Sequence, residues 1–302
     1  MSLQVLGLTG SQKEQPMLKE NTLKEHETSY RLGHSFRPKV IDYIERCHLE
    51  DGGYFFARVP PSGGLDTYFA VRSLSILGVK PGRPQAIACF FLSGIVDGTI
   101  GGITGVFLAV EVLSALGQMT DKLRNYARLQ IMALQNKAGG FGAYQDIDVE
   151  VPSELQNTYR AVRVLKIIGA DFDKEKVTGF VFSFLRRDGG YGAKGYSTLA
   201  STFYATEIYK LLGMDVGKLN ATRDYLRTTE ENWEVQFIDS LYWLVLGLAN
   251  LGEKTNVPDR VMTFVMMCQR LGGGFSRAPV MAIPTLEDTF YALSILREIR
   301  AL

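Results

Sequence analysis

Apolar residues recur at helical spacing along most of the chain, in segments that end on a glycine. A leucine or isoleucine followed by glycine closes five segments, and the gaps between successive closures are 39, 52, 44 and 39 residues. The five pairs are Leu77-Gly78, Leu116-Gly117, Ile168-Gly169, Leu212-Gly213 and Leu251-Gly252. Glycine directly after an amphipathic segment is typical of a helix C-terminus, because it adopts a left-handed backbone at no steric cost. The chain is therefore expected to consist of helical repeats.

A second register runs through the same repeats. Ten residues before each of these glycines lies an aromatic residue, and a sixth begins the last unit: Tyr68, Phe107, Tyr159, Phe203, Tyr242 and Phe290. Four units also carry a Gly-Gly-aromatic turn after a preceding apolar helix, at Gly52-Gly53-Tyr54, Gly139-Gly140-Phe141, Gly189-Gly190-Tyr191 and Gly273-Gly274-Phe275. Because a helical hairpin cannot bury its apolar face alone, such units stack. The pattern predicts an all-α fold, an (α/α)6 toroid of six helical-hairpin repeats.

The first thirty residues differ from the rest. Residues 1–30 are polar and rich in Lys and Glu, which predicts a flexible or short-helix N-terminal arm. Residues 31–302 contain no Pro/Ser-rich linker and no convincing alternation of strand period, so we expect a single toroid domain there.

Composition narrows the function classes. The chain is 46% hydrophobic and carries a net charge of +1, so no bulk charge favours nucleic acid or an acidic membrane surface. Its three cysteines are widely spaced, which argues against a disulfide framework and favours a cytoplasmic location. The longest apolar run, near residues 86–96, is too short to span a bilayer, so we expect no transmembrane segment.

Two turns and the last repeat carry a family resemblance. Gln135-x3-Gly139-x-Phe141 and Gln269-x3-Gly273-x-Phe275 resemble the Gln-Trp repeat of terpene cyclases, with Phe in place of Trp. The stretch from Cys268 to Phe290 resembles the last repeat of protein prenyltransferase β subunits. The resemblance implies a central aromatic cavity for an isoprenoid, a helical-repeat partner subunit, and a zinc ion bound by Asp, Cys and His.

The zinc ligands of that family are not reproduced. The family histidine falls on Asp288, and its Asp-x-Cys pair falls on Asp239 and Leu241 or, in another register, on Phe237 and Asp239. We therefore predict no zinc and no other cofactor. An acidic cluster at Asp146, Asp148 and Glu150 would allow Mg²⁺, but a solvated loop explains it better.

The family's diphosphate site is altered as well. Where that family has a Gly-Gly-Phe turn followed by basic residues, this chain carries Glu230, Glu231 and Glu234, which would repel a diphosphate. Arg58, Lys194 and Arg277 follow turns in other repeats. They are candidates for a displaced anion site, although solvated charges on the rim are the simpler interpretation.

Acids near the predicted starts of inner helices are the catalytic candidates. Class II terpene cyclases protonate an alkene or epoxide with an Asp-x-Asp-Asp-Thr motif, which Thr285-Leu286-Glu287-Asp288-Thr289 resembles without its first acid. Glu287 and Asp288 are the leading candidates, followed by Asp239. The competing interpretation is helix capping, which applies to Asp66, Thr67, Asn157, Thr158, Ser201, Thr202 and Asp288.

The aromatic register has two interpretations of its own. The six residues, with Trp243 and its counterparts Phe69, Tyr204 and Tyr291 one position further on, either line a cavity for an isoprenoid or another apolar small molecule, or pack the helices. Three functions thus remain open: a zinc-independent isoprenoid-handling transferase, a small class II cyclase, and a non-catalytic toroid that binds a lipid or a protein.

Overall fold

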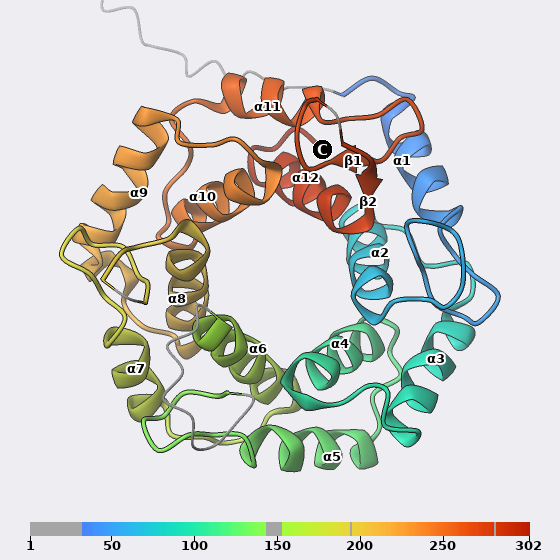
Figure 1. Cartoon of the computed structure of the whole chain (residues 1–302), viewed down its shortest axis with the longest axis horizontal. Helices are drawn as coiled ribbons and strands as arrows, with labels where there is room; N and C mark the ends of the chain where they lie inside the picture. The colour runs from blue at the N-terminus through green and yellow to red at the C-terminus, as the bar shows by residue number, and fades with distance from the viewer. Residues whose placement is uncertain (1–31, 143–152, 194, 281) are drawn as a thin grey trace, which may run out of the picture.

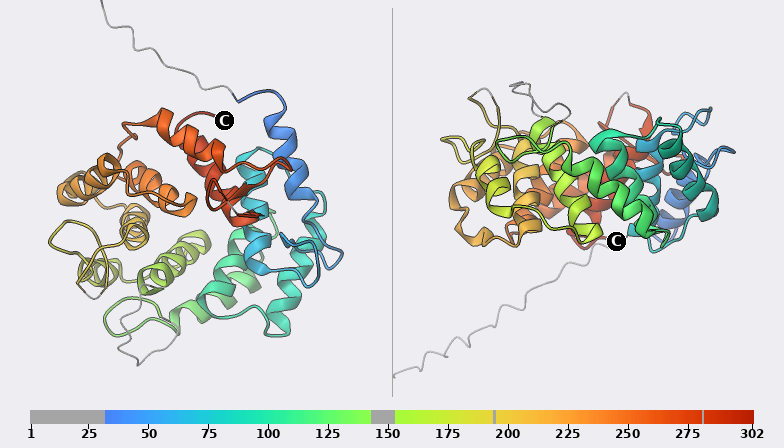
Figure 2. Two further views of the ribbon diagram at one scale, coloured as in Figure 1. Left: turned by 45° about the horizontal axis from the view of Figure 1, so that its top comes forward. Right: turned by 90° about the horizontal axis from the view of Figure 1, so that it is seen from below.

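The computed structural model describes residues 32–142, 153–193, 195–280 and 282–302. Their helices form two concentric rings around one axis, and the assembly is a flat disc when seen edge-on (Figures 1 and 2). The outer helices are α1 (Phe36–Glu45), α3 (Pro84–Val96), α5 (Asp121–Met132), α7 (Lys174–Phe182), α9 (Asn220–Asn232) and α11 (Pro258–Met267). The inner helices are α2 (Gly64–Ile76), α4 (Gly102–Ala115), α6 (Ser153–Ile168), α8 (Leu199–Leu212), α10 (Ile238–Asn250) and α12 (Leu286–Glu298). The predicted all-α toroid of six hairpins is confirmed.

The remaining elements are short. A 3₁₀ turn, η1, covers Val216–Lys218, and β1 (Phe275–Ser276) pairs antiparallel with β2 (Pro284–Thr285) directly before α12. The predicted N-terminal arm, residues 1–30, lies outside the described residues, as does the acidic cluster Asp146, Asp148 and Glu150.

The inner helices pack side by side and close the ring where α12 meets α2. Five alanines at one register position are fully buried: Ala70, Ala109, Ala161, Ala205 and Ala292. In α10 the same position holds Leu244, which is also buried. Small side chains at the contact allow the neighbouring helices to approach closely, as the repeat predicts.

The glycine at the end of each inner helix adopts the predicted conformation. The φ angles of Gly78, Gly117, Gly169, Gly213 and Gly252 lie between 68° and 78°. The backbone N–H of Val79 donates to the carbonyl of Leu74, which is the hydrogen bond of a Schellman-type helix end. These glycines therefore terminate α2, α4, α6, α8 and α10 for the steric reason inferred from the sequence.

Each Gly-Gly-aromatic turn is tied to its inner helix by one threonine. The backbone N–H of the aromatic residue donates to a threonine hydroxyl in four repeats: Tyr54 to Thr67, Phe141 to Thr158, Tyr191 to Thr202 and Phe275 to Thr289. The turn also packs on the next outer helix, where a Cβ on Gly273 would collide with the carbonyl of Lys39 in α1. The last turn thereby joins the first outer helix and helps close the ring.

The predicted starts of the inner helices were wrong by about one helical turn. The inner helices begin three to five residues earlier than the repeat suggested, so Gly63, Thr198 and Thr285 stand at the N-caps of α2, α8 and α12. None of the residues predicted as caps on those three helices occupies the N-cap; Asp66, Thr67, Ser201, Thr202 and Asp288 all lie inside the first turn. Asn157 and Thr158 likewise lie inside α6.

Candidate functional site

A cavity of about 750 Å³ lies where the N-terminal ends of several inner helices meet. Its wall combines aromatic rings with carboxylates: Phe56, Phe69, Tyr204, Trp243 and Tyr291 on one hand, and Asp66, Asp239, Glu287 and Asp288 on the other. Arg277, from the loop after β1, also lines it. All three predicted catalytic acids, Asp239, Glu287 and Asp288, are therefore brought together in one cavity.

Asp288 is the most buried of these acids. Its side chain lies in the first turn of α12 and the residue is only 7% exposed. Burial raises its pKa to about 6, with further increases from the charges of Glu287 and Asp239 and an opposing hydrogen bond from Thr285. A carboxyl with this pKa can hold a proton at mildly acidic pH and release it near neutrality.

Asp66, on α2, lines the same cavity as Asp288 on α12. Burial raises the pKa of Asp66 to about 6 as well, helped by the charge of Glu287 and opposed by a backbone hydrogen bond from Phe56. The sequence favoured helix capping over catalysis for Asp66. Because the two acids belong to the first and the last repeat, only closure of the ring brings them together.

Asp239 is compensated, in contrast to the other cavity acids. The guanidinium of Arg277 donates from Nε and Nη2 to Asp239 Oδ2 at 3.1 and 2.9 Å. The same guanidinium lies 4.3 Å from the ring centroid of Phe237. The positive charge of Arg277 is therefore already engaged, and Asp66, Glu287 and Asp288 form no ion pair within the described residues.

Two side-chain hydrogen bonds orient tyrosines of the cavity wall. The hydroxyl of Tyr291 donates to Glu287 Oε1 at 2.7 Å, one turn away on α12. On the other side, Gln156 Nε2 of α6 donates to the hydroxyl of Tyr204 on α8 at 2.6 Å. Both bonds fix ring orientation, so the aromatic wall is held by the polar groups around it.

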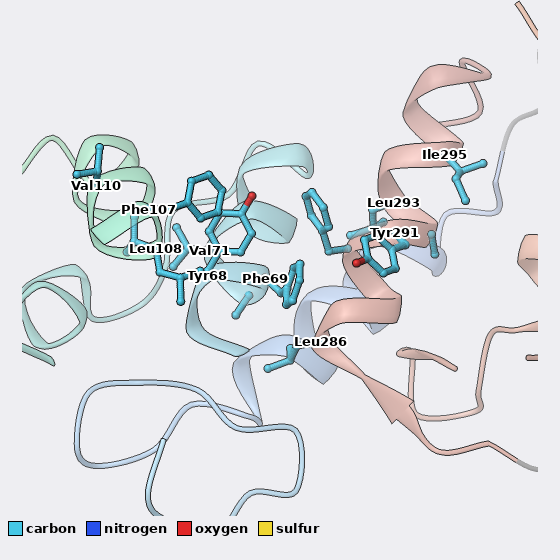
Figure 3. Packing of buried hydrophobic residues seen from close by; sticks show 14 of the residues in the cluster. Tyr68, Phe69, Val71, Phe107, Leu108, Val110, Leu286, Tyr291, Leu293 and Ile295 are labelled. Carbon is cyan, nitrogen blue, oxygen red and sulfur yellow. The ribbon is translucent and has the colours of Figure 1, made fainter. Parts of the chain in front are cut away.

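The six-residue aromatic register does not line this cavity. These six side chains instead lie against one another around the axis, and we call the set the aromatic ring: Tyr68, Phe107, Tyr159, Phe203, Tyr242 and Phe290. Centroids of Tyr68 and Phe107 are 5.4 Å apart, and Tyr204 lies between Tyr159 and Phe203 to complete the circle. Figure 3 shows Tyr68 beside Phe107, with Phe69 between α2 and α12.

The neighbouring position forms the cavity wall instead. Phe69, Tyr204, Trp243 and Tyr291 each follow a member of the aromatic ring by one residue and reach the cavity. Of the aromatic residues proposed as substrate-binding, only Trp243 is therefore placed in the cavity. The indole N–H of Trp243 is buried without a hydrogen-bond partner among the described residues. The aromatic ring packs the centre beside the cavity.

A charged layer lies one helical turn beyond the aromatic ring. Four residues after Tyr68, Phe107, Tyr159 and Phe203 come Arg72, Glu111, Arg163 and Glu207, which we call the polar layer. Glu111 is 3% exposed and forms ion pairs with Arg163 and, at 3.5 Å, with Arg72. The buried charge of Glu111 is thus compensated from both neighbouring helices.

The remaining basic candidates are elsewhere. Arg58 is exposed, lies 5.9 Å from the ring centroid of Tyr43, and does not line the cavity; Lys194 lies outside the described residues. Glu230, which sequence reasoning placed near a diphosphate site, is buried at the end of α9, paired with Arg227 and hydrogen-bonded by Thr255. The acids that would repel a diphosphate in the cavity are Asp66, Glu287 and Asp288.

The family's zinc does not fit the residues found here. Within the described part of the chain, no three His, Cys, Asp or Glu side chains gather closely enough to hold a metal ion. Leu241, at the position of a family ligand, is buried in the core, and Asp239 is engaged by Arg277. The prediction of a zinc-free protein remains to be tested by elemental analysis.

Sequence reasoning missed Gln156 and Thr285 and left Phe69, Tyr204 and Tyr291 undecided. The signal that finds the wall is the spacing i, i+3, i+4 and i+7 on each inner helix, which defines one axis-facing stripe. In α12 this stripe is Glu287, Phe290, Tyr291 and Ser294. Thr285 is found only once the true start of α12 is known.

Comparisons with known proteins agree with this architecture. A family model described as the prenyltransferase alpha-alpha toroid domain matches residues 20–97, 99–237 and 233–301. Among solved structures, the chain is similar to Candida albicans protein geranylgeranyltransferase-I complexed with GGPP, with a TM-score of 0.66 and 17% identity over 89% of this chain and 91% of that one. No curated protein matches it by sequence. None of the described helices is long and apolar enough to cross a membrane. The chain belongs to the prenyltransferase alpha-alpha toroid family.

Proposed function

We propose that this prenyltransferase β-subunit-like chain is an isoprenoid-handling enzyme in which the buried carboxyl of Asp288 protonates an alkene or epoxide of the bound ligand. The observation that carries this proposal is the position of Asp288: 7% exposed, with a pKa raised by burial to about 6, in a cavity with aromatic walls. General-acid catalysis by a positioned carboxyl needs this combination of burial and a pKa near the working pH.

The rest of the cavity supports an uncharged ligand. Arg277, the arginine among the described lining residues, is engaged by Asp239, whereas Asp66, Glu287 and Asp288 have no ion-pair partner in the described chain. Such a wall would repel a diphosphate. The rings of Phe69, Tyr204, Trp243 and Tyr291 would contact an apolar chain and stabilise positive charge that develops on it. This ordering places acid chemistry ahead of the transferase that sequence reasoning favoured.

The proton balance of the proposed step is simple. The proton leaves a carboxyl oxygen of Asp288 and bonds to one alkene carbon, using the electron pair of the double bond. The other carbon becomes cationic and Asp288 becomes a carboxylate. An internal double bond that attacks this cation forms a carbon–carbon bond and moves the positive charge to another carbon. Loss of a proton from the ligand cation to the Asp288 carboxylate or to water ends the reaction.

The test is deuterium incorporation from D₂O into geranylgeraniol or squalene, followed by mass spectrometry. We expect incorporation by the native chain, at a rate that falls as pH rises through about 6, because the acid must be protonated. Asp288→Asn should reduce the rate at least about 100-fold. The matched surface change Asp42→Asn, at an exposed acid paired with Arg46, should leave it unaltered. Equal rates for the native chain and Asp288→Asn, or no incorporation into either substrate by the native chain, would show the proposal to be wrong.

A second candidate is transfer from an isoprenoid diphosphate. It is favoured by the position of Arg277 in the cavity wall and by the similarity to a protein geranylgeranyltransferase-I complexed with GGPP. A helical-repeat partner subunit and a cytoplasmic location belong to this proposal and rest on resemblance and cysteine usage. Calorimetry separates the two: binding of geranylgeranyl diphosphate but not geranylgeraniol, lost in Arg277→Gln, would favour transfer.

A further inference from the structure

The hydroxyl of Thr285 makes two hydrogen bonds to the same residue. As the N-cap of α12, Thr285 Oγ1 accepts from the backbone N–H of Asp288 at 3.0 Å. The same oxygen donates its proton to Asp288 Oδ2 at 2.7 Å. The backbone carbonyl of Thr285 in turn accepts from the hydroxyl of Thr289 at 2.6 Å. The position of the threonine is thus fixed by the helix start, and its single proton is committed to one carboxyl oxygen.

From this geometry we infer that Thr285 is a positioning residue for the acid, an inference that rests on the proposed function. Because Oδ2 accepts the Thr285 proton, the transferable proton of Asp288 resides on Oδ1. Thr285 therefore decides which oxygen delivers the proton and holds the carboxyl plane against the start of α12. Asp66 has no threonine in the equivalent place, since the N-cap of α2 is Gly63.

Thr285 also stabilises the product of proton transfer. When Oδ1 loses its proton, the Thr285–Oδ2 hydrogen bond becomes charge-assisted and stronger. This opposes the groups that hold the proton on Asp288. Besides burial, these are Glu287 on the same helix and Asp239 on α10. Arg277 acts in the same direction as Thr285, and Cys268 is a further titratable neighbour. Thr285 therefore keeps a buried acid strong enough to donate.

The identity of the residue matters for the same reason. Thr285 stands where the Asp-x-Asp-Asp-Thr motif has its first acid. A carboxylate at this position would add a like charge beside Asp288, whereas a hydroxyl adds a donor. The chain thus reaches a usable acid with a neutral neighbour.

The experiment follows the titration of Asp288 itself by the infrared carboxyl band, assigned with Asp288→Asn, in the full chain. Thr285→Ser retains the hydroxyl and should keep the native midpoint. Thr285→Val should raise the midpoint by about one pH unit or more, because a hydrogen bond to the charged form is lost. Thr285→Asp retains an N-cap acceptor, removes the donor and adds a like charge, so its midpoint should rise further than that of Thr285→Val. It serves if the valine variant does not fold.

The deuterium assay adds a readout that a purely structural role would not change. Thr285→Val should lower the limiting rate at low pH about tenfold and move the profile to higher pH, with Thr285→Ser close to native. Loss of a helix cap alone would lower stability without moving the midpoint. An unchanged midpoint in both Thr285→Val and Thr285→Asp would overturn the inference. A native chain that shows the midpoint shift on mutation but no deuterium incorporation would contradict the proposed function, while the contact of Thr285 with Asp288 would stand.

Discussion

The polar layer and the cavity lie on either side of the aromatic ring, and both bury carboxylates. In the polar layer, Glu111 is held between Arg72 and Arg163 from the two adjacent helices. In the cavity, Asp288 is almost as buried but has a threonine and two further acids as its neighbours. Burial alone therefore does not distinguish a structural from a chemical carboxylate. The neighbouring group distinguishes the two kinds, because a buried carboxylate beside a cation stays ionised, whereas one without a cation holds its proton to higher pH.

Breaking the ion pairs of Glu111 in the polar layer should have the largest effect on the free energy of unfolding. Glu111→Gln leaves the guanidinium groups of Arg72 and Arg163 beside a neutral amide at the axis. Loss of one partner from a buried ion pair costs about 3–5 kcal/mol, and because both arginines are about 30% exposed we expect about 2–3 kcal/mol. Urea unfolding at pH 7 measures the change.

A matched variant at the same register position controls this result. Glu207→Gln makes the same change on α8, where the carboxylate accepts from Asn250 Nδ2 at 2.8 Å and forms no ion pair with an arginine of the described chain. Its cost should be clearly smaller than that of Glu111→Gln. Equal losses in the two variants would mean that compensation by arginine is not what distinguishes Glu111.

Removing the uncompensated charge should act in the opposite direction. The pKa of Asp288 is raised by burial to about 6, above its ordinary value, so between about pH 4 and 6 the folded chain holds a proton that the unfolded chain has released. Stability is therefore lost as pH rises through this window. Asp288→Asn cannot titrate, and it should be more stable than the native chain by about 1–2 kcal/mol at pH 7.5, with the gain vanishing near pH 4.

Thermal unfolding across pH 4–7.5 measures that difference. Asp66→Asn should show the same trend, since burial also raises the pKa of Asp66 to about 6. An Asp288→Asn protein that is less stable than the native chain at pH 7.5 would show that the carboxylate is compensated after all, and the contrast between the two layers would fail.

The difference between the layers also explains what the sequence could and could not predict. The helix-terminating glycines, from Gly78 to Gly252, and the buried alanines depend on interactions that the repeat pattern itself encodes, and both were predicted from the sequence. The meeting of Asp66 with Glu287 depends on ring closure between the first and last repeats, which no local pattern encodes. Thr285 was missed because α12 begins earlier than the threonine register indicated.

The aromatic register shows a subtler limit. Periodicity identified Tyr68 and Phe69 as adjacent aromatic positions of one helix and left open whether they line a cavity or pack the helices. In the structure, one step along α2 separates Tyr68, which packs in the aromatic ring, from Phe69, which lines the cavity. The alternation of Arg72, Glu111, Arg163 and Glu207 was present in the same register. This alternation of charge indicates ion pairs only once it is known that inner helices of successive repeats lie side by side.

The smallest expected effect comes from Arg277, which compensates one acid of the cavity from its rim. The side chain of Arg277 is 57% exposed, so solvent screens its pair with Asp239, and Arg277→Gln should cost no more than about 0.5 kcal/mol in urea unfolding. The same change should raise the midpoint of Asp288 slightly, because burial already raises that pKa and Arg277 is among the groups that lower it. Arg58→Gln, an exposed arginine over Tyr43 outside the cavity, should leave the midpoint where it is. A downward shift in Arg277→Gln would mean that the guanidinium does not act on Asp288 through its charge. A shift of the Asp288 midpoint as large as that of Thr285→Val would mean that the charge of Arg277 compensates Asp288 as well as Asp239. The distinction between a paired Asp239 and an unpaired Asp288 would then be wrong.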